Sequence, residues 1–269
     1  MLRLLLSALT IACLFTACQP SDSSTTEKVE TGLAPAAAPA PSPKELDPAA
    51  LSILNRALKA HGSQRLSKVN FGFTFRGSQF EFITENEKEI YKSSYEKEGK
   101  AYNDRIEGGI FHRLIDNASQ TLNEKEAYSG FETLNSVIYF ATLPHKLRDP
   151  AVNLYAAGTA TIKGKAYDML RVNFDEEGGG VDHDDNFLYW INQETNRIDY
   201  LAYDYKTNKG GVRFRSAFNP RVVAGVLFQD YVNYKAPLGT PLADLPGLFE
   251  KGKLEELSII ATEGVMQLD

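Results

Sequence analysis

The chain has 269 residues, of which 29 are Lys or Arg and 35 are Asp or Glu, so that its net charge is −6. Proteins bind nucleic acid largely by neutralising phosphates with Lys and Arg, and an acidic chain therefore argues against a nucleic-acid partner. The same charge argues against adhesion to anionic lipid by electrostatics alone. Tyr and Phe are abundant, with 13 and 15 copies, and this aromatic enrichment favours β-strands.

The first 17 residues predict a signal peptide. Arg3 supplies a positive charge, and residues 4–15 form an apolar run of the length typical of a secretory signal, too short to cross a bilayer as a helix. The run ends in FTAC (15–18), which resembles the lipobox of bacterial lipoproteins. The resemblance implies cleavage before Cys18 and acylation of this cysteine, so that its acyl chains anchor the protein in a membrane. The alternative is an ordinary secreted protein in which Cys18 has no special role.

The residues next to Cys18 indicate where the protein resides. Gln19 stands where an aspartate would indicate retention in the inner membrane, so we expect an outer-membrane lipoprotein of the cell envelope, facing the periplasm or the cell surface. Residues 18–46 are rich in Pro, Ala and Ser and lack aromatic side chains. Such a segment cannot bury enough apolar surface to fold, and it predicts a disordered tether. The other cysteine, Cys13, lies in the signal peptide, so we expect no disulfide in the mature chain.

A folded domain is predicted for residues 47–269, and it begins with a helix over residues 47–62. Asp47 suits the N-cap, Pro48 suits the first helical position, and Gly62 can end the helix in a left-handed conformation. His61 lies at the end of this helix, where we expect an interaction with the helix dipole rather than a role as a catalytic base.

Residues 69–84 predict a β-hairpin with a turn at Gly77-Ser78, because phenylalanines alternate with other residues on both sides of that turn. The links between the later strands are too short for parallel crossovers, so we expect antiparallel pairing. Strands are expected around residues 89–95, 101–106, 110–115, 158–174, 186–205, 211–218 and 225–234, with hairpin turns at 163–164 and 192–196.

A second helix interrupts these strands. Ser129 and Glu132 match a capping box, Leu134 and Ile138 belong to an apolar stripe, and Pro144 ends the helix. The fold class that follows is mainly β (α+β): a single curved antiparallel sheet, or unclosed β-barrel, of about nine to eleven strands. The helices cover its concave, apolar face.

The order of these elements resembles the LolA/LolB-like superfamily of periplasmic lipoprotein carriers. It includes a helix ending in AHG (60–62), a first strand VNFGFTF (69–75), hairpins, a helix and further hairpins. The segments LNSVIYFATLP (134–144) and NPRVVAGVLF (219–228) resemble uncharacterised lipoproteins of Bacteroidota. The resemblance implies an unclosed barrel with a helical lid over an apolar cavity. It also implies binding of acyl chains, lipoproteins or other hydrophobic cargo, although the superfamily includes sensor and adaptor domains without cargo.

The stretch DEEGGGVDHDDN (175–186) gathers six carboxylates and His183, and a flexible oxygen-rich loop could bind calcium. However, Phe187 stands where an EF-hand loop needs glycine, so a solvated hairpin loop is the favoured interpretation. The four histidines are scattered, and no nucleophile elbow, phosphate loop or dinucleotide motif occurs in the sequence. We therefore predict no catalytic residue, no metal and no cofactor.

Three functions remain open on the sequence alone. The first is a monomeric, non-enzymatic lipoprotein that binds a hydrophobic small molecule, a lipid or a lipoprotein in an apolar cavity. The second is a sensor or adaptor with a filled core that binds a protein, and a weaker third is a hydrolase or carbohydrate binder that uses residues 182–205. Alternation alone fits both a hollow and a filled interior. The candidate ligand-binding residues are Phe71, Phe73, Phe75, Phe80, Phe82, Leu134 and Ile138.

Overall fold

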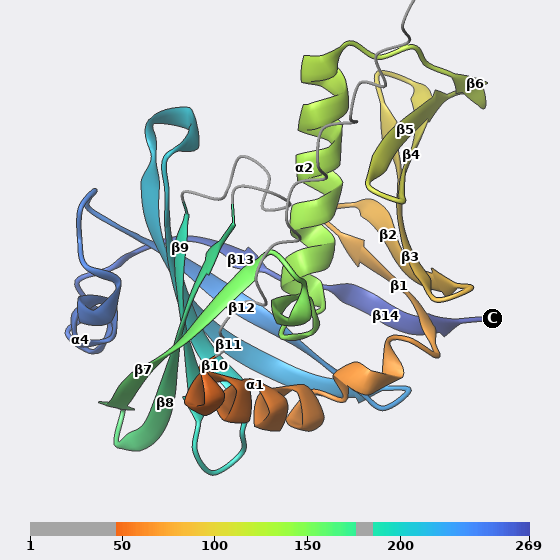
Figure 1. Ribbon diagram of the computed structural model, residues 1–269. Helices are drawn as coiled ribbons and strands as arrows, with labels where there is room; N and C mark the ends of the chain where they lie inside the picture. The colour runs from red at the N-terminus through yellow and green to blue at the C-terminus, as the bar shows by residue number, and fades with distance from the viewer. Residues whose placement is uncertain (1–46, 176–184) are drawn as a thin grey trace, which may run out of the picture. The chain divides into compact units, whose positions relative to one another are not determined.

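The computed structural model describes residues 47–175 and 185–269, and the predicted signal peptide and tether lie outside this part of the chain (Figure 1). The described residues form a mainly β fold with two antiparallel sheets of seven strands each, which confirms the predicted class. The first sheet has the order β14-β1-β2-β3-β4-β5-β6. Its strands are β1 (Asn70–Phe75), β2 (Ser78–Glu85), β3 (Lys88–Lys97), β4 (Lys100–Glu107), β5 (Ile110–Ile115), β6 (Ala118–Ser119) and β14 (Glu263–Leu268).

The second sheet has the order β13-β12-β11-β10-β9-β8-β7. The expected hairpin at Lys163-Gly164 is confirmed, and both residues have the positive φ that a tight two-residue turn requires. The first hairpin turns at Arg76-Gly77, one residue earlier than expected. The strands of the second sheet are β7 (Val152–Ile162), β8 (Lys165–Phe174), β9 (Asn186–Asn192), β10 (Ile198–Tyr205), β11 (Gly211–Val223), β12 (Val226–Ala236) and β13 (Glu255–Ile260).

The two sheets are joined where β13 leads into β14. β13 pairs with β12, and β14 pairs with β1, so the last two strands carry the chain from the second sheet into the first. At the far edges, β6 and β7 are not neighbours in the strand order of the described chain, and helix α2 (Glu124–Ala141) connects them. The wall is therefore an open barrel made of two sheets with a corner between them. The sequence analysis expected one sheet and did not foresee β13 and β14.

A small polar network holds this corner together. Asp230 on β12 is 3% exposed, and its carboxylate accepts a hydrogen bond of 3.0 Å from the backbone N–H of Thr262. Arg221 on β11 forms an ion pair of 3.1 Å with Asp230 and donates to the backbone oxygen of Thr262 and, at 2.6 Å, to its hydroxyl. One buried carboxylate and one guanidinium thus tie the loop between the sheets to both β11 and β12.

Helix α1 (Pro48–Ala60) begins as predicted, because Asp47 accepts hydrogen bonds from the backbone N–H groups of Ala49 and Ala50. The same carboxylate also accepts from Ala156 on β7 at 2.8 Å, which fastens the helix to the second sheet. Gly62 has a φ of 67°, and a Cβ atom there would lie 1.9 Å from the carbonyl oxygen of Gly225. Glycine is thus required both by the conformation and by the close approach of the hairpin between β11 and β12.

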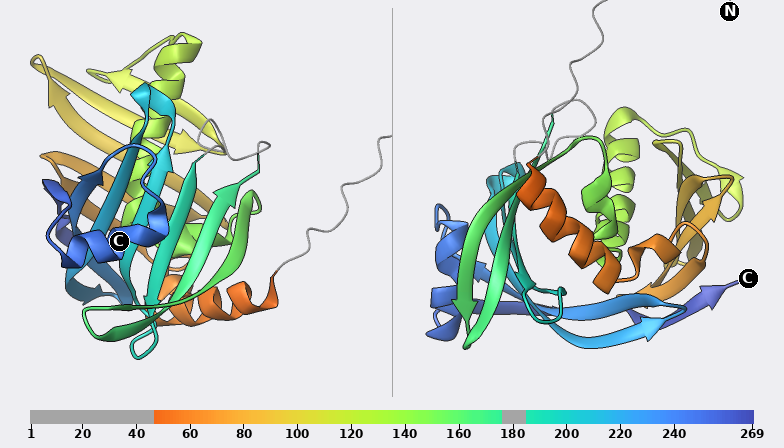
Figure 2. Two further views of the ribbon diagram at one scale, coloured as in Figure 1. Left: turned by 90° about the vertical axis from the view of Figure 1, so that its left-hand side faces the viewer. Right: turned by 60° about the horizontal axis from the view of Figure 1, so that its bottom comes forward.

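Helix α2 begins earlier than predicted. Its capping box is formed by Asn123 and Glu126, so the expected capping box of Ser129 and Glu132 is wrong, and both residues lie inside the helix. The apolar stripe is confirmed, because Leu134 and Ile138 are buried against the first sheet. Both α1 and α2 lie on the inner side of the wall formed by the two sheets (Figure 2).

The second sheet is covered on both faces. Helix α4 (Leu245–Glu250) packs on its outer side, where the ring of Phe249 lies 5.2 Å from that of Phe214 (Figure 1). Trp190 and Leu245 are fully buried in this outer cluster, whereas Tyr189 is fully buried in the inner one. This double burial explains why β9 is apolar along almost its whole length. The short helical turns are η1 (Ser63–Arg65), η2 (His145–Arg148), η4 (Thr207–Lys209) and η5 (Leu242–Asp244).

His61 ends α1 as expected, but its ring works as a hydrogen-bond acceptor. The side chain is 2% exposed, and its Nε2 atom accepts a hydrogen bond of 3.1 Å from the backbone N–H of Ile198 on β10. Burial, assisted by the positive charge of Arg197, lowers the pKa of His61 from 6.5 to about 3. The ring is therefore neutral at physiological pH, and the expected interaction of a charged His61 with the helix dipole is wrong.

The pKa of His61 predicts a pH-dependent stability. The folded state holds the ring neutral, so below pH 6.5 the unfolded state binds a proton that the folded state excludes until about pH 3. The free energy of unfolding should therefore fall with decreasing pH, by at most about 1.4 kcal/mol per pH unit from this group. His61→Gln keeps an acceptor but does not titrate, so urea unfolding between pH 6.5 and 4 should show a shallower slope in the variant. Identical slopes in both proteins would contradict this account of His61.

Candidate functional site

Two cavities lie on either side of α2. The first, which we call the arginine pocket, has a volume of about 380 Å³, and the second, the side pocket, has a volume of about 760 Å³. Ser136 and Phe140 of α2 and Phe187 of β9 line both. The helix therefore separates two hollows on the inner side of the wall.

The floor of the arginine pocket consists of alternate residues on neighbouring strands of the second sheet. Because successive side chains of a strand point to opposite faces, Tyr203 and Tyr205 on β10 share the inner face with Arg213 and Arg215 on β11. Helix α2 forms the roof, and the turn between β1 and β2 forms a side wall. The lining residues are Phe75, Arg76, Ser136, Val137, Phe140, Ala141, Asp185, Phe187, Tyr203, Tyr205, Thr207, Arg213, Arg215, Gln229, Tyr231, Asn233, Ile260 and Thr262.

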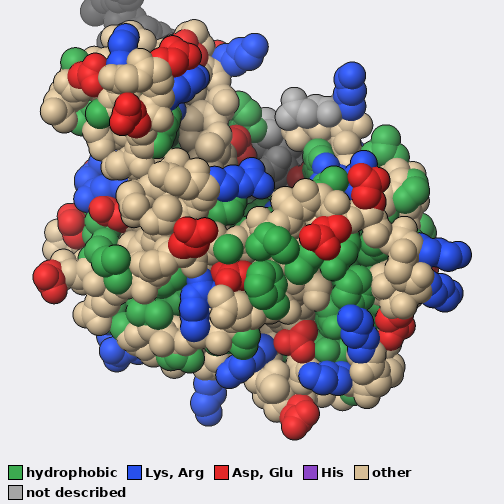
Figure 3. Space-filling view, turned by 180° about the vertical axis from the view of Figure 1, so that it is seen from behind, with side chains coloured by type: hydrophobic (Ala, Val, Ile, Leu, Met, Phe, Trp, Pro, Cys, Tyr) green, Lys and Arg blue, Asp and Glu red, His purple; other side chains and the backbone are tan. Residues whose placement is uncertain are grey.

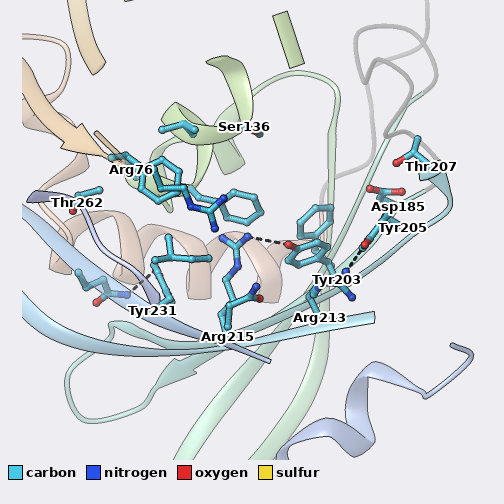
Figure 4. Close-up of a pocket in the computed structure, with 18 residues that line it drawn as sticks. Arg76, Ser136, Asp185, Tyr203, Tyr205, Thr207, Arg213, Arg215, Tyr231 and Thr262 are labelled. Atoms are coloured by element: carbon cyan, nitrogen blue, oxygen red, sulfur yellow. Dashed lines mark hydrogen bonds between the residues drawn. The ribbon is translucent and has the colours of Figure 1, made fainter. Parts of the chain in front are cut away.

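Arg215 is the central charged group of this pocket (Figure 4). Its side chain is 7% exposed, and its guanidinium carbon lies 3.8 Å from the centre of the Phe140 ring on α2. Its only hydrogen bond within the described residues is one of 2.9 Å to the hydroxyl of Tyr203, and its Nε–H has no acceptor. No carboxylate of residues 47–175 or 185–269 lies within ion-pair distance of it. A buried cation is thus held by aromatic rings and one hydroxyl group.

Two further arginines and one carboxyl group share the lining. Arg213 donates to the hydroxyl of Tyr205 at 2.5 Å and lies over its ring, and Arg76 lies over the ring of Phe75. Asp185, which is 6% exposed, is the acidic residue among the lining residues. Among the described lining residues, three guanidinium groups stand against one carboxyl group, so this lining carries an excess of positive charge, although the whole chain is acidic. On the face opposite to that of Figure 1, both signs of charge are interspersed (Figure 3).

The side pocket has a different chemistry, because the buried charges at its wall are paired with one another. Lys146 forms ion pairs with Glu89 at 3.1 Å and with Asp149 at 2.8 Å, and His145 lies 2.8 Å from Glu89. Burial opposes the ionisation of Glu89, but the hydrogen bond from His145 and the charge of Lys146 outweigh it and lower the pKa of Glu89 to about 2. This cluster joins the segment after α2 to β3, and its charges are already satisfied.

Helix α2 is also held from the second sheet. The hydroxyl groups of Tyr139 on α2 and Tyr189 on β9 lie 2.7 Å apart and share a hydrogen bond. Burial raises the pKa of both phenols, so both remain neutral at physiological pH. The helix therefore rests on the first sheet through an apolar stripe and on the second sheet through a neutral polar contact.

The structure separates the seven candidate ligand-binding residues into two groups. Phe75 lines the arginine pocket. The other six are buried together in the cluster between the first sheet and α2, and they line neither cavity. These six residues are Phe71, Phe73, Phe80, Phe82, Leu134 and Ile138.

The sequence analysis missed the arginines of β11. In the stretch VRFR (212–215), arginine alternates with apolar residues, which normally indicates that the arginines face solvent. Because α4 covers the outer face, Val212 and Phe214 occupy the outer core, and the arginines point inward. The sequence alone could not reveal this arrangement. The alternation suggests that one side of the strand faces solvent, but a strand in a sheet that is covered on both faces has no such side.

The acidic loop of the sequence analysis falls largely outside the described residues, which include only its ends, Asp175, Asp185 and Asn186. Within the described ranges, no three His, Cys, Asp or Glu side chains lie together in a way that could hold a metal ion. None of the helices in these ranges has the length and hydropathy needed to cross a bilayer.

The sequence family of the chain can now be stated. A family described as DUF6503, a family of unknown function, matches residues 80–262. The chain belongs to this family. The DUF6503 segment contains all residues that line the arginine pocket except Phe75 and Arg76.

Several solved structures are similar to this chain. A LolA superfamily protein from Nitrosomonas europaea has a TM-score of 0.47 and 12% identity, over 82% of this chain and 94% of that one. A DUF1329 family protein from Desulfovibrio piger has a TM-score of 0.38 and 7% identity, over 81% and 92% of the two chains. The lipoprotein LppX from Mycobacterium tuberculosis has a TM-score of 0.29 and 16% identity, over 61% and 91%. No curated protein matches the chain.

The unpaired state of Arg215 predicts that the arginine pocket lowers the stability of the fold. Replacing a buried charge by an apolar side chain of similar volume is neutral or stabilising when the charge lacks a partner. Part of this gain is offset by the lost contact with Phe140. We expect Arg215→Met to raise the free energy of unfolding in urea by about 1 kcal/mol.

Arg221→Met on the same strand is the matched control. It leaves the buried carboxylate of Asp230 without its ion pair, and we expect a loss of about 3 kcal/mol. A comparable loss of stability in Arg215→Met would show that Arg215 stabilises the fold, and this would contradict the prediction that its unpaired charge lowers the stability.

Proposed function

We propose that this chain is a non-enzymatic, monomeric lipoprotein of the cell envelope that binds a hydrophobic ligand in the arginine pocket. The observation that carries the proposal is a cavity of about 380 Å³ beneath α2, in which aromatic and apolar residues make up half of the lining and polar or charged residues the other half. Ligand pockets for small molecules typically have volumes of about 300–1,000 Å³, with a few polar groups on an apolar lining. A lipid, an acyl chain or the acylated end of a lipoprotein has the chemistry that such a lining accepts.

The six candidate residues that are buried together form the contact between α2 and the first sheet. Leu134 and Ile138 of α2 pack against phenylalanines of the first sheet. A movement of α2 away from the sheet would uncover these rings and would enlarge the space beside Phe75. In this proposal α2 is the lid and the phenylalanines of β1 and β2 form the surface for a longer chain.

A second candidate is a sensor or adaptor that binds a protein through its surface. It is favoured by the close packing of the same six residues, because a filled interior beneath the lid leaves no room there for cargo. The two functions differ in one measurable property, which is the affinity for small apolar molecules.

Filling the arginine pocket should abolish binding of an apolar probe. Asn233 lies on β12 in the pocket lining. Its side-chain oxygen has no hydrogen-bond partner and its side-chain nitrogen donates one long bond of 3.4 Å to Ser258, so Asn233→Trp adds volume at the loss of one weak hydrogen bond. We expect the fluorescent probe N-phenyl-1-naphthylamine to bind the wild type and to bind Asn233→Trp about tenfold more weakly or worse. Ser94→Trp, an exposed position on β3, should bind like the wild type. Equal binding by all three proteins, or by none, would favour the adaptor.

Location and anchoring form a separate part of the proposal. We place the protein in the outer membrane of a bacterium of the Bacteroidota, facing the periplasm or the cell surface, with Cys18 as the site of acylation and residues 18–46 as the tether. The support is the FTAC sequence at residues 15–18 and the glutamine that follows it.

Acylation at Cys18 can be tested by metabolic labelling. Cells that express the full chain are grown with radiolabelled palmitate, and the protein is isolated from the membrane and soluble fractions. We expect the wild type to carry the label in the membrane fraction and Cys18→Ala to lose both the label and the tight membrane association. Cys13→Ala, within the signal peptide, should behave like the wild type. A Cys18→Ala chain that keeps its label would refute acylation at this residue.

A further inference from the structure

We infer that the arginine pocket selects amphiphiles with an anionic head group, which Arg215 holds while the apolar chain lies along the aromatic lining. This inference rests on the proposed function and narrows its ligand class. It predicts that a carboxylate or phosphate at the end of an apolar chain is part of what the protein recognises.

The first argument is the unused hydrogen-bonding capacity of Arg215. A guanidinium group has five N–H donors in a planar fork that matches the two oxygens of a carboxylate or phosphate. Within the described residues only one of these donors has an acceptor, the hydroxyl of Tyr203. Buried charged groups are normally paired, so a buried guanidinium with so few partners indicates a site for an anion from outside the chain.

The second argument is the contrast with the other buried or half-buried charges of the protein. Arg221 is paired with Asp230, Arg113 with Asp104 and Lys146 with Glu89, each at 3.1 Å or less. Each of these three half-buried cations is thus neutralised by a carboxylate. Arg215 differs, because its nearest aromatic and hydroxyl partners orient the guanidinium without neutralising it.

The third argument is the charge of the pocket as a whole. In the part of the chain that the structure describes, Arg76 and Arg213 share the lining with one carboxyl group, that of Asp185, so positive charge exceeds negative charge there. In a partly buried site of low dielectric constant, this excess attracts an anion more strongly than the same charges would on an exposed surface. The guanidinium of Arg213 already donates two hydrogen bonds, to Tyr205 and to the backbone oxygen of Val212, whereas that of Arg215 donates one, which leaves Arg215 as the principal donor.

The fourth argument is the apolar surface beside the cation. The Phe140 ring covers the guanidinium from the side of α2, and Phe75, Val137 and Ile260 belong to the same lining. A ligand whose head group bonds to Arg215 therefore shares the cavity with apolar side chains. This juxtaposition fits a molecule with an anionic end and an apolar body, whereas a free inorganic anion leaves most of the lining unfilled.

Two matched probes test the inference: dansyl-labelled undecanoic acid and its methyl ester, which differ only in the charge of the head. They are titrated by fluorescence into the chain from residue 47 onward, which has its own hydrophobic core. We expect the wild type to bind the acid about tenfold or more tightly than the ester, because a charged hydrogen bond discriminates by about this factor. Arg215→Met should lose this preference and keep its affinity for the ester within about twofold. Arg171→Met, which removes an exposed arginine of β8, is the matched control and should keep the preference.

Competition then identifies the source of the anion. Dodecanoate or dodecyl phosphate should displace the acid probe, whereas acetate and inorganic phosphate at the same concentrations should not. Displacement by the short anions alone would overturn the inference in favour of a simple anion site. Equal affinity of the wild type for the acid and the ester would also overturn it while leaving the proposed function intact. If neither probe binds to any of the proteins, the proposed function itself fails.

Discussion

The passage of the chain from β13 into β14 is the constraint on which the rest of the structure depends. The two seven-stranded sheets meet at this corner, and Asp230, Arg221 and Thr262 hold it in place with polar contacts. Because the sheets are joined at this side, the barrel opens on the other side, between β6 and β7. The open side is where α2 lies. Ile260 ends β13, and Thr262 lies in the linker that follows it. Both residues line the arginine pocket, so the position of the corner also determines the position of this part of the pocket wall.

Burial on both faces of the second sheet gives the site its chemical character. An antiparallel sheet usually leaves one face for charged residues, but here α4 covers the outside and α1 and α2 cover the inside. The charged residues of β11 consequently lie in the interior and must find partners there. Arg221 finds one in Asp230, whereas the partners of the Arg215 guanidinium among the described residues are aromatic rings and a hydroxyl group. A residue that is expected to weaken the fold in this way is typical of a site in which binding supplies the missing contacts.

Much of the local structure could be predicted from the sequence, because it depends on neighbouring residues. Asp47 and Gly62 define the ends of α1, and the turn at Lys163-Gly164 requires only two residues with positive φ. The long-range features could not be predicted in this way. The pairing of β14 with β1 joins segments almost 200 residues apart, and β14 is largely exposed, with no strong apolar alternation that would identify it as a strand.

In the site, too, local features could be predicted from the sequence and long-range features could not. Phe75 was identified because alternation in a strand is a local signal, but the same signal selected four phenylalanines that lie in a packed cluster, and the helical stripe selected two more residues of that cluster. Whether a phenylalanine faces a cavity or another ring depends on the position of α2. This position depends on contacts between residues far apart in the sequence, such as the hydrogen bond between Tyr139 and Tyr189. Arg213 and Arg215 were overlooked for the reverse reason. Their alternation predicts a solvent-facing side, and only the position of α4 shows that the sheet has none.

The central claim is that the arginine pocket holds a hydrophobic ligand, and native mass spectrometry of the protein tests it most directly. The chain from residue 47 onward, as wild type and as Asn233→Trp, is purified without detergent from the organism that makes it. The account predicts that the wild type carries an added mass in the range of a fatty acid or phospholipid, which is lost on denaturation and is absent from the variant. The same added mass on both proteins, or the bare chain mass for both, would contradict it.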